Sequence, residues 1–249
     1  MKEEKFKILW VEAVQAPRKY SSGCSSIDEL LGGGFEAGTI TQLYGEAGSG
    51  KTNICLQLAV KCAREGKKVI YIDSEGFSPE RFMQIAGEDA MRIAKNIIIF
   101  EPLNFEQQAA AIREVDELMA KIGDEVSVII LDSATLFYRV ELDDDRSISL
   151  KRELASQIAH LLEIARKYDV AVVITNQVYM DVDGGELRPS GGHALEHLSK
   201  VIIQLERVGN GRRKATIKKH RSLPEGISCE FVITNNGVVE PEEVRNSHR

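Results

Sequence analysis

The sequence predicts an α/β fold in which a doubly wound, mostly parallel sheet ends in antiparallel C-terminal strands. Five strand-like runs alternate with helix-like runs up to Thr175, and these strands are nearly continuous stretches of Val, Ile and Leu. Strands that are apolar on both faces are typical of a parallel sheet covered by helices on both sides. After Lys200, short turns separate three further strands, a pattern that favours antiparallel hairpins along one edge.

The first elements surround a glycine-rich loop. A polar turn over 21–26 precedes a short helix over 27–31, which Ser25 or Ser26 can cap and which three glycines end. A strand over 39–44 then leads into the glycine-rich loop, and an amphipathic helix over 53–64 follows it. The chain therefore has the strand–loop–helix order that a phosphate-binding loop needs.

The later elements are predicted from apolar runs and from the residues that flank them. Ser78 as N-cap and Pro79 at the first helical position start one helix, and Asn104 with Gln107 starts another that reaches about residue 122. An amphipathic stripe predicts a third helix over 149–167. The strands are expected at 67–73, 96–100, 126–132, 170–175, 200–208, 212–219 and 229–234.

Composition fits one domain with a well-formed core. The chain has 249 residues, 43% of them hydrophobic, and a net charge of -6, so a nucleic-acid site would have to come from a local basic cluster. The four cysteines lack a Cys-x-x-Cys pair, and Cys55 and Cys62 are expected to be buried thiols in a reducing compartment. We find no signal sequence and no membrane-spanning run, which predicts a cytoplasmic protein without a membrane partner.

The glycine-rich loop carries the spacing Gly, four residues, Gly-Lys-Thr. Glycines let backbone N–H groups converge on one anion, and the following helix adds the positive end of its dipole. Lys51 can reach β- and γ-phosphates, and the Thr52 hydroxyl can hold Mg²⁺. The alternative is a glycine-rich turn with a chance Lys-Thr, which the flanking strand and helix disfavour. The predicted phosphate loop is Gly45, Glu46, Ala47, Gly48, Ser49, Gly50, Lys51 and Thr52.

Polar side chains end three of the predicted parallel strands, and the carboxyl ends of such strands meet where ligands bind. Asp132 follows four apolar residues and is expected to orient Mg²⁺ and its waters. Glu75 can orient or deprotonate an attacking water, and the Asn176–Gln177 amides can contact a γ-phosphate. Taken alone, Asp132 could be a turn cap and Glu75 a solvated loop acid.

Several segments in order along the chain resemble the RecA/RadA recombinase superfamily, and within it the RadB group of short archaeal RadA paralogues. The resemblance runs from about residue 23 to the C-terminus. The segments are IDELLGGGFEAG (27–38), YGEAGSGKT (44–52), DSEGFSPER (73–81), LDS (131–133), TNQV (175–178), RPSGGH (188–193) and LPEG (223–226).

The resemblance implies a RecA-like ATPase domain over 21–249 that binds ATP and Mg²⁺, preceded by an arm or docking segment over 1–20. Glu75 would be the catalytic carboxylate, acting with Lys51, and Gln177 would sense the γ-phosphate. Asn53 would extend the nucleotide site, and Arg81 would lie against the adenine. Thr52 and Asp132 would hold the metal, and the segments 137–147 and 178–192 would face DNA.

Some features depart from a full recombinase. The acidic run Asp143–Asp145 and the acids Asp181, Asp183 and Glu186 would repel a phosphate backbone, which argues against strand exchange. Only about twenty residues precede the core, where RadA carries a helical DNA-binding domain. The segment 10–13 has an aromatic-x-x-Ala shape, loosely like the segment through which RadA polymerises.

A basic cluster in the 212–219 strand and just beyond it offers another DNA surface. Alternation places Lys214 and Lys218 on one face of the strand. We consider a DNA-backbone patch, a solvated edge protected by lysines, and a Lys-x-Arg finger in which Lys219 and Arg221 reach a neighbouring subunit. The candidate DNA-binding residues are Arg213, Lys214, Lys218, Lys219 and Arg221.

The sequence thus favours an ATP-binding, weakly ATP-hydrolysing, DNA-binding accessory protein in homologous recombination and DNA repair. Its expected partners are ATP, single-stranded DNA and a RadA-type recombinase, with homo-oligomers also possible. The alternatives are a KaiC-like regulatory ATPase without a DNA role, an active filament-forming recombinase, and a nucleotide switch that does not hydrolyse ATP.

Overall fold

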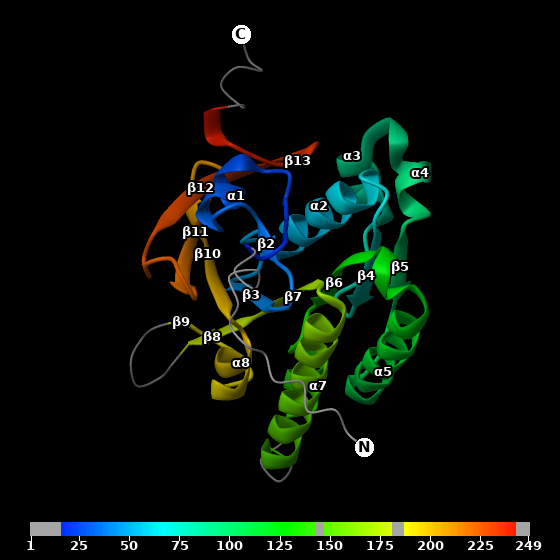
Figure 1. Ribbon diagram of the computed structural model, residues 1–249. Coiled ribbons are helices and arrows are strands. Elements are labelled where there is room, and N and C mark those ends of the chain that lie inside the picture. Colours follow the sequence, from blue (N-terminus) through cyan, green and yellow to red (C-terminus); the bar gives the residue numbers. More distant parts are fainter. Residues whose placement is uncertain (1–15, 143–146, 181–186, 243–249) are drawn as a thin grey trace.

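The computed structural model describes residues 16–142, 147–180 and 187–242, and its centre is a nine-stranded sheet (Figure 1). Every pairing from β5 to β10 is parallel, and every pairing from β10 to β13 is antiparallel. The predicted fold class is therefore confirmed. In order across the sheet, the strands are β13 (Gly237–Val239), β12 (Ser228–Thr234), β11 (Arg212–Lys219), β10 (Val201–Gly209), β3 (Ile40–Gly45), β7 (Ala171–Asn176), β6 (Val126–Asp132), β4 (Lys68–Asp73) and β5 (Ile97–Phe100).

Helices cover both faces of the sheet, and a separate apolar core lies on each face (Figure 1). Helices α1 to α4 contribute to one core, and α5 to α8 contribute to the other. All residues of β3 and β6 are buried, which explains why their sequences are apolar without alternation. The helices are α1 (Ser25–Leu30), α2 (Lys51–Arg64), α3 (Pro79–Ala86), α4 (Ala90–Ala94), α5 (Phe105–Ile122), α6 (Leu136–Val140), α7 (Ser147–Tyr168) and α8 (His193–Leu198).

Two short ribbons lie outside the central sheet. In the first, β1 (Lys19–Tyr20) pairs with β2 (Phe35–Glu36), so the end of the predicted N-terminal arm is a strand of a separate two-stranded sheet. In the second, β8 (Val178–Met180) pairs with β9 (Leu187–Pro189). The aromatic-x-x-Ala segment at 10–13 lies outside the described residues.

The predicted helix caps are partly confirmed. The Ser78 hydroxyl accepts from the Arg81 amide at 3.2 Å, and the Asn104 side chain accepts from the Gln107 amide at 2.8 Å. The cap predicted for the first helix is wrong, because α1 begins at Ser25 and its N-cap is Cys24, without a side-chain bond. Two preceding hydroxyls bond to the carboxylate of Asp28 instead.

The last strand is fastened to the helix that follows the phosphate loop. The Gln57 side chain on α2 donates to the Val238 carbonyl at 2.8 Å and accepts from the Val238 amide at 2.5 Å. Both residues are buried, with exposed fractions of 9% and 1%. The Gln57 side chain therefore pairs the N–H and the carbonyl of Val238, which would otherwise be buried without partners on that edge of β13.

Gln57→Leu should lower the free energy of unfolding by about 2–4 kcal/mol, because it leaves a buried N–H and a buried carbonyl unpaired. Urea denaturation measures the change. Glu114→Ala, on the exposed face of α5, is the control and should unfold like the parent. An unchanged midpoint for Gln57→Leu would show that the clamp contributes nothing to stability.

Candidate functional site

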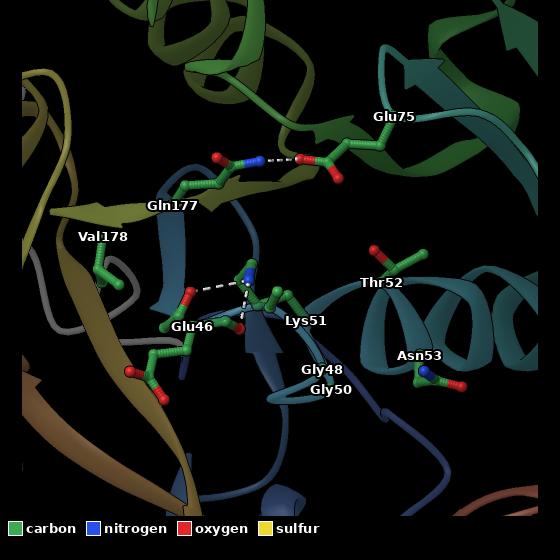
Figure 2. Close-up of a pocket in the computed structure, with 11 residues that line it drawn as sticks. Glu46, Gly48, Gly50, Lys51, Thr52, Asn53, Glu75, Gln177 and Val178 are labelled. Carbon is green, nitrogen blue, oxygen red and sulfur yellow. Dashed lines mark hydrogen bonds between the residues drawn. The ribbon is translucent and has the colours of Figure 1, made fainter.

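A cavity of about 270 Å³ opens at the carboxyl ends of β3, β4 and β7 (Figure 2). This is the edge at which open parallel sheets bind ligands. Nearly all of the predicted phosphate loop lines it, together with side chains from two other strand ends. The lining residues are Gly45, Glu46, Ala47, Gly48, Gly50, Lys51, Thr52, Asn53, Glu75, Gln177 and Val178.

The glycines of the loop are required by its geometry. A side chain at Gly45 would meet the Leu205 carbonyl oxygen of β10 at 2.1 Å. Gly50 has a φ of 108° as the N-cap of α2, and this helix has neither a side-chain cap nor an acidic residue in its first turn. The N–H groups at the start of α2 are therefore left for an anion in the cavity.

Lys51 lies over this loop as a largely buried cation. Its ammonium donates to the Gly45 carbonyl at 2.8 Å and to the Glu46 carbonyl at 3.0 Å (Figure 2). Burial lowers the pKa of Lys51, and the charges of Glu75 and Asp132 act in the opposite direction. Phosphate oxygens are stronger partners for an ammonium than neutral carbonyls, so this side chain suits a triphosphate.

Asp132 is fixed by hydroxyl groups from three other elements. Its carboxylate accepts from Tyr71 at 2.9 Å and from Thr175 at 2.5 Å, and it also bonds to the Thr52 side chain. Burial raises the pKa of Asp132, while the three hydroxyl bonds lower it. The sequence interpretation missed Tyr71 and Thr175, because their positions within apolar strands give no sign of this contact.

The pair Thr52 and Asp132 fits Mg²⁺ rather than a metal held by protein alone. Magnesium commonly takes one or two protein oxygens and completes its shell with phosphates and waters. Within the described ranges, no group of three or more His, Cys, Asp or Glu residues could hold a metal ion. One carboxylate and one hydroxyl beside a phosphate loop therefore match the predicted ion.

Glu75 and Gln177 both line the cavity, and their side chains point toward one another (Figure 2). The Gln177 side-chain nitrogen donates to Glu75 Oε1 at 2.8 Å, and the guanidinium of Arg139 on α6 donates to Gln177 Oε1. The predicted catalytic pair is thus brought together, and Arg139 joins it. Sequence reasoning missed Arg139, which lies 38 residues before Gln177 in the chain.

A second strand-end carboxylate, Asp73, shapes the turn that carries Glu75. It is the register partner of Asp132, and it accepts from the Gly76 amide at 3.0 Å. Burial, followed by the charge of Asp132, raises the pKa of Asp73 to about 6, against the opposing effect of backbone N–H groups from the turn. Its place at a strand end, like that of Asp132, was a signal that could have identified it.

Arg81 lies at the rim of the site. Its Nε donates to the side chain of the cavity residue Asn53 at 2.7 Å, and Nη1 donates to the Asn235 carbonyl at 3.0 Å. Its Nη2 is buried and has no hydrogen-bond partner. The structure thus places Arg81 between the start of α2 and the turn before β13, with a donor unused.

The five basic residues near β11 do not form one surface. Lys219 donates to the Glu196 and Ser199 carbonyls at the end of α8, and Arg221 pairs with Glu36. Arg213 donates to the Gly48 carbonyl of the phosphate loop at 3.4 Å. Lys214 and Lys218 share the face opposite buried Ala215 and Ile217, as alternation predicts.

Comparison with known proteins places the chain in a family. The model of the Rad51 family matches residues 3–241. The chain belongs to the Rad51 family. It is 60% identical to the DNA repair and recombination protein RadB of Methanococcoides burtonii, over 87% of this chain and 96% of the relative. It is 53% identical to the protein of the same name from Archaeoglobus fulgidus, over 87% of this chain and 96% of that protein.

A solved structure of a similar protein has the same fold. It is described as the RadB recombinase, and it is 35% identical with a TM-score of 0.77, covering 89% of this chain and 99% of its own. The expected resemblance to RecA/RadA recombinases and to RadB is thereby confirmed. None of the helices in the described ranges is long and apolar enough to cross a membrane.

In this Rad51-family chain, the two segments expected to face DNA are only partly described. The first contains α6, and the second contains the β8–β9 ribbon. The acidic residues 143–145, Asp181, Asp183 and Glu186 lie outside the described residues. Their effect on DNA binding therefore remains an expectation from sequence.

Proposed function

We propose that this Rad51-family protein binds ATP with Mg²⁺, hydrolyses it slowly, and binds DNA as an accessory factor in homologous recombination and DNA repair. One observation carries the proposal. The uncapped start of α2, the Lys51 ammonium and the Thr52 side chain meet at one cavity, and the buried Asp132 carboxylate interacts with Thr52. The relatives named DNA repair and recombination protein RadB support the biological role.

Each side chain has a separate task in this proposal. The backbone N–H groups from Gly45 to Thr52 bind the phosphates, and Lys51 contacts the β- and γ-phosphates. Thr52 and Asp132 hold Mg²⁺, which neutralises charge on the phosphate oxygens. Asn53 and Arg81 contact the nucleoside end.

Glu75 orients the attacking water and accepts its proton, and Gln177 contacts the γ-phosphate. The contact between these two side chains supports the assignment, because it brings both to the same side of the cavity. Measuring ATP hydrolysis with and without single-stranded DNA tests the proposal directly. A chain that neither binds nor cleaves ATP would overturn it.

The proposal treats residues 21–249 as one ATPase domain and residues 1–20 as an arm or docking segment. A RadA-type recombinase and further copies of the chain are the proposed protein partners. The pairing of β1 with β2 joins Lys19 and Tyr20 to the folded domain, which favours a boundary just before Lys19.

DNA binding is proposed for the outward face of β11, through Lys214 and Lys218. Lys214→Glu combined with Lys218→Glu should weaken retention of single-stranded DNA by about tenfold at low salt, with unchanged ATP affinity. Filter binding over a salt series measures the loss, which should come with a shallower salt dependence.

Lys95→Glu with Lys121→Glu changes the net charge equally at exposed sites elsewhere and is the control. It should keep most of the affinity. An equal loss in both double variants would indicate a general charge effect and would reject the β11 patch.

A further inference from the structure

We infer that Arg139 is a positioning residue for ATP hydrolysis, acting on Glu75 through the side-chain amide of Gln177. The inference rests on the proposed function. It starts from a chain of two hydrogen bonds, Arg139 to Gln177 and Gln177 to Glu75, that runs from α6 to the cavity. Arg139 itself does not line the cavity, whereas the other two residues do.

The donors and acceptors of the three side chains fix the direction of these two hydrogen bonds. A guanidinium has only donors, and a glutamate carboxylate has only acceptors. Gln177 therefore has to present its oxygen to Arg139 and its nitrogen to Glu75. Arg139 and Glu75 thus favour the same one of the two orientations in which the amide group can lie, and Arg139 holds it from the side away from the cavity.

The selected orientation is the useful one for an anionic ligand. The amide nitrogen carries two N–H donors, and only one is needed for Glu75 at 2.8 Å. The other can be directed at a phosphate oxygen in the same cavity. With the amide reversed, its oxygen would face both the Glu75 carboxylate and the phosphates, which are repulsive contacts.

Buried hydrogen bonds at the start of α6 hold Arg139 in this position. The Thr135 hydroxyl donates to Asn176 Oδ1 at 2.6 Å, and Asn176 Nδ2 donates to the Ser190 carbonyl at 2.5 Å. Asn176 immediately precedes Gln177, and Arg139 lies one helical turn after Thr135, with its amide donating to the Thr135 carbonyl at 3.0 Å. Two successive side-chain amides at the end of β7 therefore contact this region. Asn176 bonds to Thr135 at the start of α6, and Gln177 bonds to Arg139 one turn later.

The test is a double-mutant cycle on hydrolysis. Arg139→Ala should lower kcat roughly fivefold with little change in KM for ATP, because one orienting hydrogen bond is lost. Arg139→Lys, which keeps a donor-only cation, should recover part of the rate. In a Gln177→Ala background, Arg139→Ala should have no further effect on kcat, because the arginine then has no amide to orient.

Arg113→Ala, an exposed arginine on α5, is the matched control and should behave as the parent. Independent, multiplicative effects of the two substitutions would overturn the inference while leaving the proposed ATPase intact. An Arg139→Ala variant with the kcat of the parent would do the same.

A second readout does not depend on hydrolysis. Hydrogen exchange of the amides in 74–78 should be faster in Arg139→Ala and in Gln177→Ala than in the parent, because the restraint on Glu75 is weakened in the first variant and lost in the second. If the parent fails to cleave ATP, the proposed function fails on its own. Unchanged exchange in Arg139→Ala would then still reject the coupling.

Discussion

Glu75→Gln should bind ATP and Mg²⁺ as tightly as the parent but cleave ATP at least about 100-fold more slowly. The amide cannot accept a proton from the attacking water, although it has nearly the shape of the carboxylate. Glu75 lines the cavity but is not one of the groups that bind the phosphates or the metal in our proposal, so binding should survive. Calorimetry of ATP binding, with a single-turnover assay of cleavage, measures the two effects separately.

Glu46→Gln is the matched control, because Glu46 is another carboxylate that lines the same cavity. It should keep most of the rate. If both variants slow hydrolysis equally, the loss reflects the negative charge of the cavity. If Glu75→Gln turns over ATP as fast as the parent, the catalytic carboxylate has been misassigned.

Lys51→Ala should weaken ATP binding by about 100-fold or more and abolish measurable hydrolysis. The substitution removes a buried cation whose present partners are the Gly45 and Glu46 carbonyls. Each of these neutral carbonyls would lose one hydrogen bond, whereas a bound triphosphate would lose its closest positive charge. Titration with a fluorescent ATP analogue measures the affinity, and circular dichroism checks that the variant is folded.

Lys61→Ala, on the same helix and ion-paired with Glu65, provides the comparison. It should bind ATP like the parent, since an exposed ion pair contributes little. Equal ATP affinity for the parent and both lysine variants would mean that this cavity is not the phosphate site.

The secondary structure was largely predictable, because its signals are local. The apolar run ending in Asp132 became β6, and the Ser78-Pro79 pair starts α3 as expected. The short last strand β13 was not predicted, because three residues give too little pattern. It depends on the buried contact with Gln57, a residue far away in the sequence.

The candidate site was predictable in its parts but not in its connections. The motifs identified Lys51, Glu75 and Gln177 as site residues, and all three line one cavity in the structure. The hydroxyls that fix Asp132 and the arginine that orients Gln177 depend on how strands and loops meet in space. Likewise, the sequence grouped Lys219 and Arg221 with the outward lysines, while the structure directs them to partners within the chain.

The bond between Gln57 and Val238 joins residues 181 positions apart, and it has a consequence for how the protein matures during synthesis. Phe231 and Ile233 of β12 also lie against Gly50, at the start of α2. A ribosome produces the phosphate loop before this supporting hairpin, so in a nascent chain the start of α2 lacks these packing and hydrogen-bond contacts until residues 231–238 have been synthesised.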